Sequence, residues 1–599
     1  MARQAAGRRR PSRRVLRQRR IVLVAGCVIV GAAVTGGVAL WGGDDTRAQR
    51  VALVQRYVTA WGRGDYATMH RLLTPPVRRR VSLREFAATH RAQLATATAK
   101  AGPRVEDGEP RVDGELVSVR LELQTVAFGT VRAAVTLPIS LEDGNEGVRW
   151  RERLAFPGLR RGERLRAETR LPTRATVLTA DGGVLAAGTE RRPDPALADV
   201  ASETVGALGA MDDGRAAELL GRGVPVDAEV GASGLERALD DRLTGTPGGR
   251  LLGGSRVLAT RAPRAAAPVR TTIVPSVVRA AVSALGDRDG GAVALDPRNG
   301  ALLGYAGVPF SGLRAPGSTF KVITLAAALE AGVTSADAAF PYETAALLDG
   351  APLQNAHGEL CGGSLIESFA HSCNSVFAPL GAAVGAERLA QTARRFGFDA
   401  PSDILGAATS SVPGEEGGED ALTVGSTAIG QGKVLASALQ MASAAATIAR
   451  GGTRPLLTLA VGGGAPAAAE ARVARARRAT SASVARVVQQ AMRAVVEEGT
   501  GTAAAIDGVA VAGKTGTAEL GVSCTPEAAE AELCDSEDPT DTDAWFVGYA
   551  PADQHGDETA ATVAVGVVLM QSGAGGDTAA PVARELIVAA LGASADATR

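Results

Sequence analysis

Lysine is scarce in this chain, because only four of its 64 basic residues are lysine and the rest are arginine. Two of the four lie in polar motifs, Ser-Thr-Phe-Lys at 318–321 and Lys-Thr-Gly-Thr at 514–517. A desolvated lysine beside another cation can give up its proton, whereas a guanidinium stays charged. Lys321 lies on the same helical face as the serine three residues before it, so it is the candidate general base for that hydroxyl.

Cysteine and histidine are also rare, with five residues of each. The histidines do not cluster with the cysteines and zinc-ligand spacing is missing, so no metal site is expected. Apart from Cys27, the cysteines form two close pairs, Cys361 with Cys373 and Cys524 with Cys534. An oxidising compartment would allow two disulfides, and buried free thiols are the alternative, because spacing does not establish bonding geometry.

Positive charge is not in excess, since 64 basic residues balance 64 acidic residues. Residues 1–20 contain nine arginines and no acidic residue, so the rest of the chain has 55 basic against 64 acidic residues. This mildly acidic remainder argues against a nucleic acid partner, since phosphate binding needs a basic surface. At 599 residues the chain should divide into three or four folding units.

One long segment, from Ile21 to Leu40, has no charged residue. Twenty such residues can span a bilayer as a helix. The arginines before it predict a basic cytoplasmic arm at 1–20, a transmembrane signal anchor at 21–41 and a catalytic domain outside the cytoplasm. A cleaved signal peptide is an alternative, and residues 24–27 resemble the processing site of a bacterial lipoprotein, which would involve Cys27.

Three folding units are expected after the anchor. Residues 46–155 have helical apolar repeats followed by strands with alternating apolar and polar residues, which predicts an α+β domain. Residues 156–270 contain a strand, an Asp181-Gly182 turn and another strand, which favours a mostly β domain. Residues 272–590 combine an Asn299-Gly300 hairpin with apolar helices, which predicts an antiparallel sheet flanked by helices.

Two motifs in the last unit can perform nucleophilic catalysis. Ser318 begins an apolar helix, where backbone N–H groups and the helix dipole can stabilise an oxyanion and help lower the pKa of Lys321. Ser372 can relay a proton to a leaving amine, and Asn374 can bind a substrate amide or Lys321. The structural alternatives are an N-cap for Ser318 and an ordinary polar turn for the second motif.

The third motif puts Lys514 at the end of an apolar β segment. Lys514 would supply positive potential, while the N–H groups of Thr517 and Ser318 could form an oxyanion hole. Thr515 and Thr517 would bind a substrate carboxylate, and Gly516 between them would let a substrate backbone lie alongside. A phosphate loop is the competing interpretation, but the residues before Gly-Lys-Thr read as a strand rather than a glycine loop.

Together the motifs resemble the Ser-x-x-Lys, Ser-x-Asn and Lys-Thr-Gly set of penicillin-binding proteins and serine β-lactamases. Residues 272–590 resemble the α/β-sandwich transpeptidase domain, with a β-lactamase-like fold, of class B penicillin-binding proteins of actinobacterial type. The runs 430–432, 499–502 and 544–551 also look like that family. Residues 156–270 resemble its dimerisation-type domain, although Ala175 replaces the usual glycine. The run AWGRGDYATMHRLL resembles an NTF2-like domain, which would cover 46–155.

The resemblance implies a peptidoglycan D,D-transpeptidase that needs no cofactor. Ser318 would form an acyl-enzyme at the D-Ala-D-Ala end of peptidoglycan stem peptides and would be acylated by β-lactams such as penicillin. The membrane, glycan-polymerising enzymes and divisome or elongation proteins are the other implied partners. A D,D-carboxypeptidase, a non-catalytic β-lactam sensor and a serine β-lactamase remain alternatives, although the candidate loop at 411–420 lacks the Leu-Asn pair of class A β-lactamases.

Overall fold

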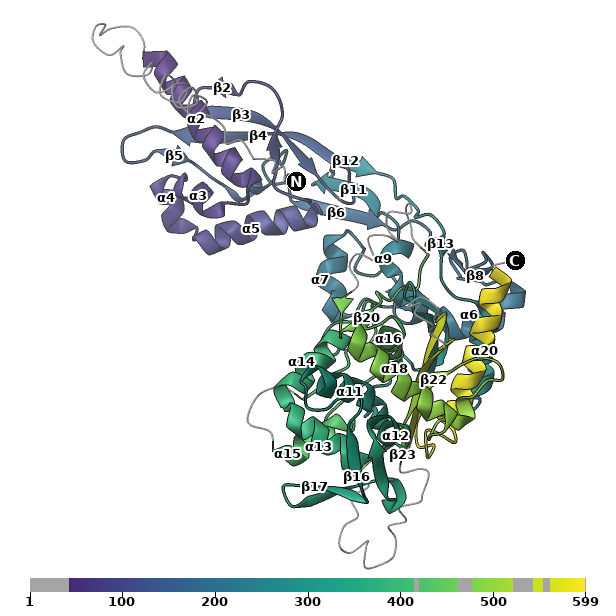
Figure 1. The fold of residues 1–599 in the computed structure, drawn as a ribbon. Coiled ribbons are helices and arrows are strands. Elements are labelled where there is room, and N and C mark those ends of the chain that lie inside the picture. The colour runs from purple at the N-terminus through teal and green to yellow at the C-terminus, as the bar shows by residue number, and fades with distance from the viewer. Residues whose placement is uncertain (1–41, 414–419, 462–476, 521–541, 553–560, 598–599) are drawn as a thin grey trace, which may run out of the picture. The chain divides into compact units, whose positions relative to one another are not determined.

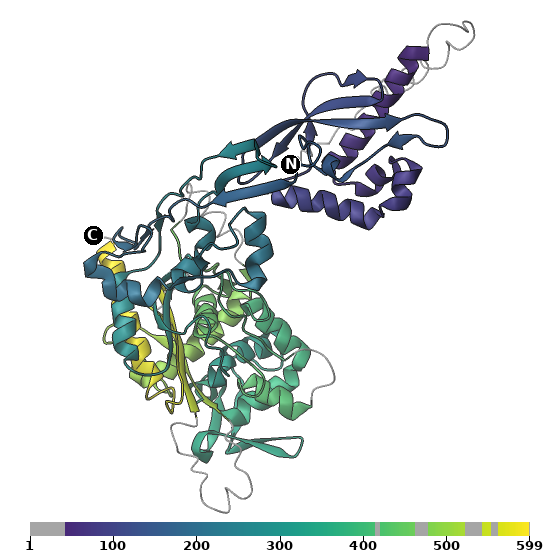
Figure 2. The ribbon, with the colours of Figure 1, turned by 180° about the vertical axis from the view of Figure 1, so that it is seen from behind.

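The structure is a computed structural model, and it describes residues 42–413, 420–461, 477–520, 542–552 and 561–597. The predicted basic arm and signal anchor lie outside these residues. Within the described ranges, no helix is long and apolar enough to cross a membrane. The chain forms two compact units: residues up to 164, without 95–100 and 125–131, and those two segments together with residues from 165 onward (Figures 1 and 2).

The first unit is α+β, as the sequence predicted. Its helices are α2 (Gly42–Gly62), α3 (Tyr66–Arg71), α4 (Pro75–Arg80) and α5 (Leu83–Thr96). Its strands are β1 (Arg104–Val105), β2 (Arg111–Asp113), β3 (Leu116–Gln124), β4 (Thr130–Ser140) and β5 (Gly147–Val148). The sheet order is β1-β3-β4-β5, with β2 paired to β3. Every second residue of β3 is buried, because strand side chains alternate between faces.

The core of the first unit is rich in aromatic residues. Trp61, Phe86 and Trp150 are almost fully buried beside apolar residues of β3 and β4. The imidazole of His90 lies among the rings of these three residues. The helices therefore bury their apolar stripe against one face of the sheet.

The start of the second unit is more helical than the sequence predicted. The strands of this segment form small sheets: β6 (Leu165–Arg170), β7 (Val177–Leu178), β8 (Val184–Ala186), β9 (Leu208–Gly209), β10 (Val230–Gly231), β11 (Gly248–Gly253), β12 (Arg256–Arg261) and β13 (Val269–Arg270). Four helices lie between them: α6 (Ala198–Thr204), α7 (Asp213–Gly221), α8 (Gly234–Ala238) and α9 (Asp240–Leu243). The sequence does not indicate these helices, because they span only four to nine residues, too short for a clear helical period.

The main sheet of the second unit is antiparallel, as predicted, and it has five strands. Its order is β15-β14-β24-β23-β22. The bounds are β14 (Gly290–Asp296), β15 (Ala301–Gly307), β22 (Ala512–Glu519), β23 (Thr542–Ala550) and β24 (Val563–Leu569). Ala292 and Ala294 of β14 pack with α10 (Pro275–Leu285) and α20 (Ala579–Ala597), whereas Val293 packs in a second core cluster. Both faces of the sheet are therefore covered by apolar layers.

The second core cluster is mostly helical. Besides residues of α6, α8 and α9, it contains the helices α11 (Lys321–Glu330), α12 (Leu365–Ala370), α13 (Asn374–Val384), α14 (Ala386–Phe396), α15 (Ala421–Ala428), α16 (Ala438–Ala449) and α18 (Ala482–Glu497). Short strands lie beside them: β16 (Ala339–Glu343), β17 (Ala345–Leu348), β18 (Ala351–Gln354), β19 (Cys361–Ser364), β20 (Thr453–Arg454) and β21 (Arg477–Arg478). Residues 321–328 of α11 are all buried, since a helix that is apolar on every side lies inside a core. That position carries Lys321 into the interior.

Candidate active site

Ser318 lies in a 3-10 turn, η3 (Gly317–Phe320), directly before α11. The turn packs closely on β22, since a Cβ at Gly317 would lie only 2.5 Å from the Thr517 carbonyl oxygen. Gly317 also has a positive φ of 50° and donates its N–H to the Gly430 carbonyl at 3.0 Å. Glycine therefore permits the approach of Ser318 to the third motif.

The N-cap interpretation of Ser318 was wrong. Pro316 is the N-cap of η3 and Phe320 is that of α11, so the serine caps neither element. Its side chain is half-buried rather than enclosed. This leaves the Ser318 hydroxyl available for another role.

Lys321 is fully buried and meets the second motif. Its Nζ donates to the Ser372 carbonyl at 2.6 Å, to the Ser372 hydroxyl at 3.2 Å and to Asn374 Oδ1 at 2.6 Å. Burial holds the pKa of Lys321 well below its ordinary value, and repulsion from Lys514 lowers that pKa further. The physical requirement for a lysine base, a poorly solvated ammonium near another cation, is therefore present.

The three contacts of Lys321 allow a proton to move. A neutral amine has two N–H bonds and one lone pair, so it can keep the two contacts at 2.6 Å as a donor. The longer contact with the Ser372 hydroxyl can then reverse, with the hydroxyl donating to the amine. Lys321 and Ser372 thus form a pair that can hold or pass one proton.

Ser372 lies in the turn between α12 and α13, and Asn374 directly follows that turn. Ser372 has a positive φ of 62°, an uncommon conformation for a residue with a Cβ. Asn374 begins α13, and its amide donates to the Gln354 carbonyl at 2.7 Å while Oδ1 accepts from Lys321. The simple alternative of an ordinary polar turn does not describe these buried contacts with a lysine.

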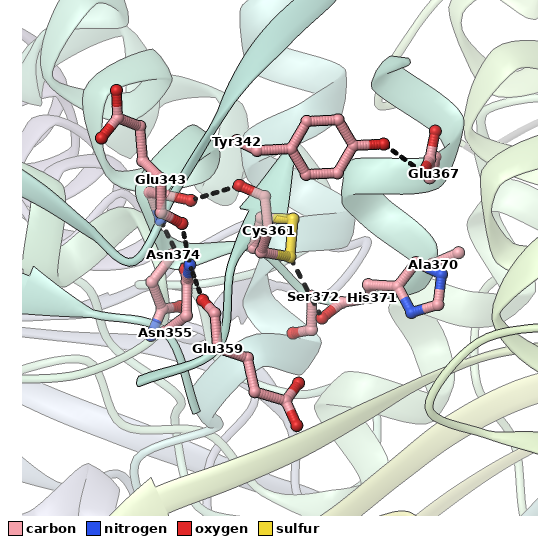
Figure 3. The surroundings of a disulfide bond; sticks show 12 residues. Tyr342, Glu343, Asn355, Glu359, Cys361, Glu367, Ala370, His371, Ser372 and Asn374 are labelled. Atoms are coloured by element: carbon pink, nitrogen blue, oxygen red, sulfur yellow. Dashed lines mark hydrogen bonds between the residues drawn. A yellow bond between two sulfur atoms is a disulfide. The ribbon is translucent and has the colours of Figure 1, made fainter. Parts of the chain in front are cut away.

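A disulfide joins Cys361 to Cys373, the residue between Ser372 and Asn374 (Figure 3). This is one of the two pairs that the sequence allowed. The other pair, Cys524 and Cys534, lies outside the described residues. The second motif is therefore covalently attached to β19.

Lys514 is fully buried in β22. Its Nζ donates to the Thr515 carbonyl at 3.1 Å and lies 5.6 Å from the centre of the Phe369 ring. Burial lowers the pKa of Lys514 to about 7. The sequence predicted positive potential at this position, and a group with this pKa carries that charge only in part at neutral pH.

The strand that carries Lys514 is the edge of the five-stranded sheet. Within the described part of the chain, β22 pairs with β23 along residues 512–519. The turn before Ser318 packs against it, since a Cβ at Gly516 would lie 2.7 Å from the Pro316 carbonyl oxygen. Thr515 is buried and Thr517 is exposed. The third motif therefore runs beside the turn that carries Ser318.

Thr500 is a site residue whose role the sequence did not reveal. Its hydroxyl lies 2.5 Å from that of Thr515, and its N–H donates to the Ala370 carbonyl at 3.1 Å. The signal was the Gly-Thr-Gly-Thr run at 499–502, which served only as a family pattern. Among the described residues, no group of three or more His, Cys, Asp or Glu could hold a metal ion.

These contacts define a class of protein. A serine precedes a buried lysine by one turn, and that lysine contacts a second serine and an asparagine. A second buried lysine lies on an edge strand that packs against the turn carrying the first serine, and its charge lowers the pKa of the first lysine. This is the arrangement of a serine acyltransferase that uses lysine as its base.

Comparison with known proteins agrees. The family described as penicillin binding protein transpeptidase domain matches residues 290–588. Peptidoglycan D,D-transpeptidase PbpA of Mycolicibacterium smegmatis is 35% identical over 419 residues, which cover 60% of this chain and 80% of that protein. The chain belongs to the penicillin-binding protein transpeptidase family, in its class B and actinobacterial type.

Two solved structures support the fold. Penicillin-binding protein A of Mycobacterium tuberculosis, as a penicillin G acyl-enzyme complex, is 27% identical with a TM-score of 0.51, covering 70% of this chain and 99% of that one. A D,D-transpeptidase domain from Eggerthella lenta is 26% identical with a TM-score of 0.54, at the same coverage. The predicted transpeptidase fold at the C-terminus is thereby confirmed.

Proposed function

We propose that this chain is a peptidoglycan D,D-transpeptidase that cross-links stem peptides through an acyl-enzyme at Ser318. The observation that carries the proposal is the buried Lys321, which contacts both Ser372 and Asn374 and has a lowered pKa. The similarity to PbpA and to a penicillin G acyl-enzyme complex supports the same reaction.

Acylation begins with the Ser318 hydroxyl. Its oxygen attacks the carbonyl carbon of the penultimate D-Ala, and its proton passes to the neutral amine of Lys321. The close packing of Gly317 on Thr517 supports an oxyanion hole from the N–H groups of Ser318 and Thr517. The product of this step is a tetrahedral oxyanion bonded to Ser318.

The oxyanion then collapses and the peptide C–N bond breaks. Ser372 gives its hydroxyl proton to the departing nitrogen of the terminal D-Ala and regains a proton from Lys321, with which it is already in contact at 3.2 Å. An amine of a neighbouring stem peptide next attacks the ester. Its proton passes to Lys321 and on to Ser318, which leaves as the free hydroxyl.

The third motif binds the substrate in this proposal. Thr515 and Thr517 hold the terminal carboxylate, Gly516 leaves room for the substrate backbone, and Lys514 adds positive potential in its charged form. A buried ammonium near a carboxylate favours the bound anion. Penicillin fits the same arrangement because its carboxylate and lactam carbonyl resemble the D-Ala-D-Ala end.

The remaining segments are proposed to hold the enzyme at the outer face of the cell membrane. Residues 21–41 would form a single transmembrane helix with the catalytic domain outside the cytoplasm. The Cys361–Cys373 disulfide supports that location, since disulfides persist in oxidising compartments. The α+β unit, which we propose to be NTF2-like, would be a spacer or a docking module for glycan-polymerising enzymes and other cell-wall proteins.

The test uses the full chain in detergent with fluorescent penicillin, followed over hours on a gel. Wild type should keep its label, Ser318→Ala should not be labelled, and Ser311→Ala, at an exposed serine of the preceding loop, should match wild type. Label on Ser318→Ala, or none on wild type, would overturn the acyl-enzyme.

The labelled enzyme is then tested for turnover. D-Ala release from a pentapeptide, with transfer to an added amine, is the expected result. Rapid loss of the penicillin label would favour a β-lactamase, release of D-Ala without transfer a carboxypeptidase, and stable label without any peptide reaction a sensor.

A further inference from the structure

We propose that the ion pair between Arg314 and Asp543 positions the oxyanion hole of the active site. In the proposed function this hole consists of the N–H groups of Ser318 and Thr517. Arg314 lies in the loop that leads to Ser318, and Asp543 lies in β23, which pairs with the strand of the third motif. The proposal deepens the proposed function and depends on it.

Asp543 lies beside the strand that carries Thr517. It pairs with Ala518 across β22 and β23, one register step beyond Thr517. Asp543 and Trp545 share one face of β23, because strand side chains alternate between faces. Trp545 and Ala518 both pack in the second core cluster, to which α11 belongs. The side chain of Asp543 is therefore on the face of the sheet that the turn of Ser318 covers.

Arg314 reaches this point from the loop at 308–316. Its Nε lies 3.3 Å from Asp543 Oδ2, and its Nη2 donates to the sulfur of Met570, at the end of β24, at 3.3 Å. Its backbone N–H donates to the Ala436 carbonyl at 3.0 Å, and its carbonyl accepts from the Ala436 N–H at 2.8 Å. Both the backbone and the side chain of Arg314 thus fasten the loop.

The fastened residue is close to the nucleophile in the chain. Three residues separate Arg314 from Ser318, and one of them is Pro316, whose ring restricts its backbone. The Pro316 carbonyl oxygen accepts from the Thr319 hydroxyl at 2.6 Å and would lie 2.7 Å from a Cβ at Gly516. This short segment packs on β22, so a shift of Arg314 moves the Ser318 N–H relative to that strand.

The carboxylate of the pair depends on the guanidinium. The side chain of Asp543 is 1% exposed, whereas that of Arg314 is 44% exposed. Asp543 Oδ1 accepts from the Gln571 N–H at 3.0 Å, but Oδ2 has no hydrogen-bond partner within the described ranges. Burial raises the pKa of Asp543, and the Gln571 N–H and Arg314 oppose that rise. Removing Arg314 leaves a buried carboxylate without a counter-charge and releases the loop from β23.

The expected effect falls on the chemical step. Loss of one oxyanion-hole donor usually slows a reaction by about 10²- to 10³-fold. Loss of the ion pair shifts the donors without removing them, so acylation should slow by about 10-fold. The binding of penicillin before acylation should stay the same, because the oxyanion forms only after the serine has attacked. That separation distinguishes positioning from a general loss of stability.

The experiment measures fluorescent penicillin acylation of the full chain in detergent at several penicillin concentrations, which separates the acylation rate constant from the dissociation constant. Arg314→Met and Asp543→Asn should each lower the rate constant about 10-fold at an unchanged dissociation constant. Arg314→Met/Asp543→Asn should be no slower than either single variant, since both remove the same contact. Arg314→Lys keeps the positive charge and should recover most of the rate.

A boronic acid analogue of D-alanine provides a second readout. Its tetrahedral adduct with Ser318 places an oxygen in the oxyanion hole, as the transition state does. Its affinity for Arg314→Met and Asp543→Asn should therefore fall by the same factor as the acylation rate constant. Arg314→Met changes an exposed side chain, so it carries the test even if Asp543→Asn does not fold.

The matched control is an exposed ion pair of the same compact unit. Arg279 Nε lies 2.6 Å from Asp199 Oδ2, and Arg279→Met/Asp199→Asn should acylate like wild type. A wild-type rate constant in Arg314→Met, or a change confined to the dissociation constant or to the fraction of protein that takes label, overturns the positioning role. Wild type that takes no label contradicts the proposed function itself, which separates the two failures.

Discussion

The two compact units each bury nitrogen bases, and they treat them differently. In the first unit His90 is 0% exposed among aromatic rings, and within the described residues neither ring nitrogen has a hydrogen-bond partner. Burial lowers its pKa to about 3. In the second unit Lys321 and Lys514 are also 0% exposed, but each Nζ donates to an oxygen.

The difference shows that a lowered pKa does not identify a catalytic base. Burial depresses the pKa of all three groups, because a low-dielectric interior disfavours their charged forms. Only Lys321 contacts a hydroxyl through which a proton can pass. His90 acts as a flat ring that completes an aromatic core. Partners, rather than burial, separate the functional base from the structural one.

Replacing Lys321 should have the largest effect on acylation, because it removes the catalytic base. Lys321→Met keeps the apolar stem and removes the base, so penicillin acylation should slow by about 10²- to 10⁴-fold. Lys321→Arg should lose as much, because guanidinium does not give up its proton. The measurement is the second-order rate constant of labelling. His90→Phe is the matched control, and labelling of Lys321→Met within tenfold of wild type would contradict the assignment of the base.

Replacing Lys514 tests the coupling between the two lysines. At pH 6, where Lys514 is mostly charged, Lys514→Met should slow acylation by about 10²-fold, the usual cost of one electrostatic contact to the transition state. The pH profile should also change at both ends. Wild type loses the charge on Lys514 as pH rises through about 7, so its alkaline limb should disappear in the variant.

The acid limb reports Lys321, which must be neutral to act. Repulsion from Lys514 lowers the pKa of Lys321, so its removal raises that pKa and moves the acid limb to higher pH. The profile of the labelling rate constant between pH 5 and pH 9 provides the check. An acid limb at the same pH in both proteins would mean that the lysines are not coupled.

Within the second unit, the sequence predicted the five-stranded sheet and the three motifs well, and the segment 165–270 less well. The motifs at Ser318, Ser372 and Lys514 could be found because each is a short run of polar residues with fixed spacing inside a mostly apolar part of the chain. The contact between Thr500 and Thr515 could not, since it depends on α18 ending beside β22. The Cys361–Cys373 disulfide could not be assigned from sequence, because spacing alone does not show that two cysteines meet. The burial of His90 could not be predicted either, because a single histidine adds no apolar period to a helix.

His90 should control the acid stability of the first unit. Its pKa is 6.5 in the unfolded chain and about 3 in the fold, so below pH 6.5 only the unfolded state takes up the proton. Stability is therefore complete above pH 6.5 and is lost as pH falls toward 3. The linkage amounts to about 1.4 kcal/mol per pH unit, or about 2 kcal/mol between pH 6.5 and pH 5.

The measurement is urea unfolding of the full chain, followed by tryptophan fluorescence, which includes Trp61 and Trp150 beside the histidine as well as Trp41 and Trp545. His90→Phe keeps the ring and removes both unpartnered nitrogens, so its unfolding free energy should lose this pH dependence. Equal slopes with pH in the two proteins would show that His90 is not the titrating group. Penicillin labelling at pH 7 should be the same in both.

The smallest effects should come from two hydroxyls, one with a hydrogen-bond partner and one without. Thr500 contacts Thr515 at 2.5 Å, so Thr500→Val should slow acylation about fivefold, and Thr500→Ser should restore it. The buried Tyr57 hydroxyl has no partner within the described residues, and Tyr57→Phe should raise the unfolding free energy by about 1 kcal/mol without affecting labelling. Because one hydroxyl has a partner and the other has none, deletion should cost activity in the first case and add stability in the second. A destabilised Tyr57→Phe, or a Thr500→Ser that stays as slow as Thr500→Val, would mean that packing rather than hydrogen bonding governs these positions.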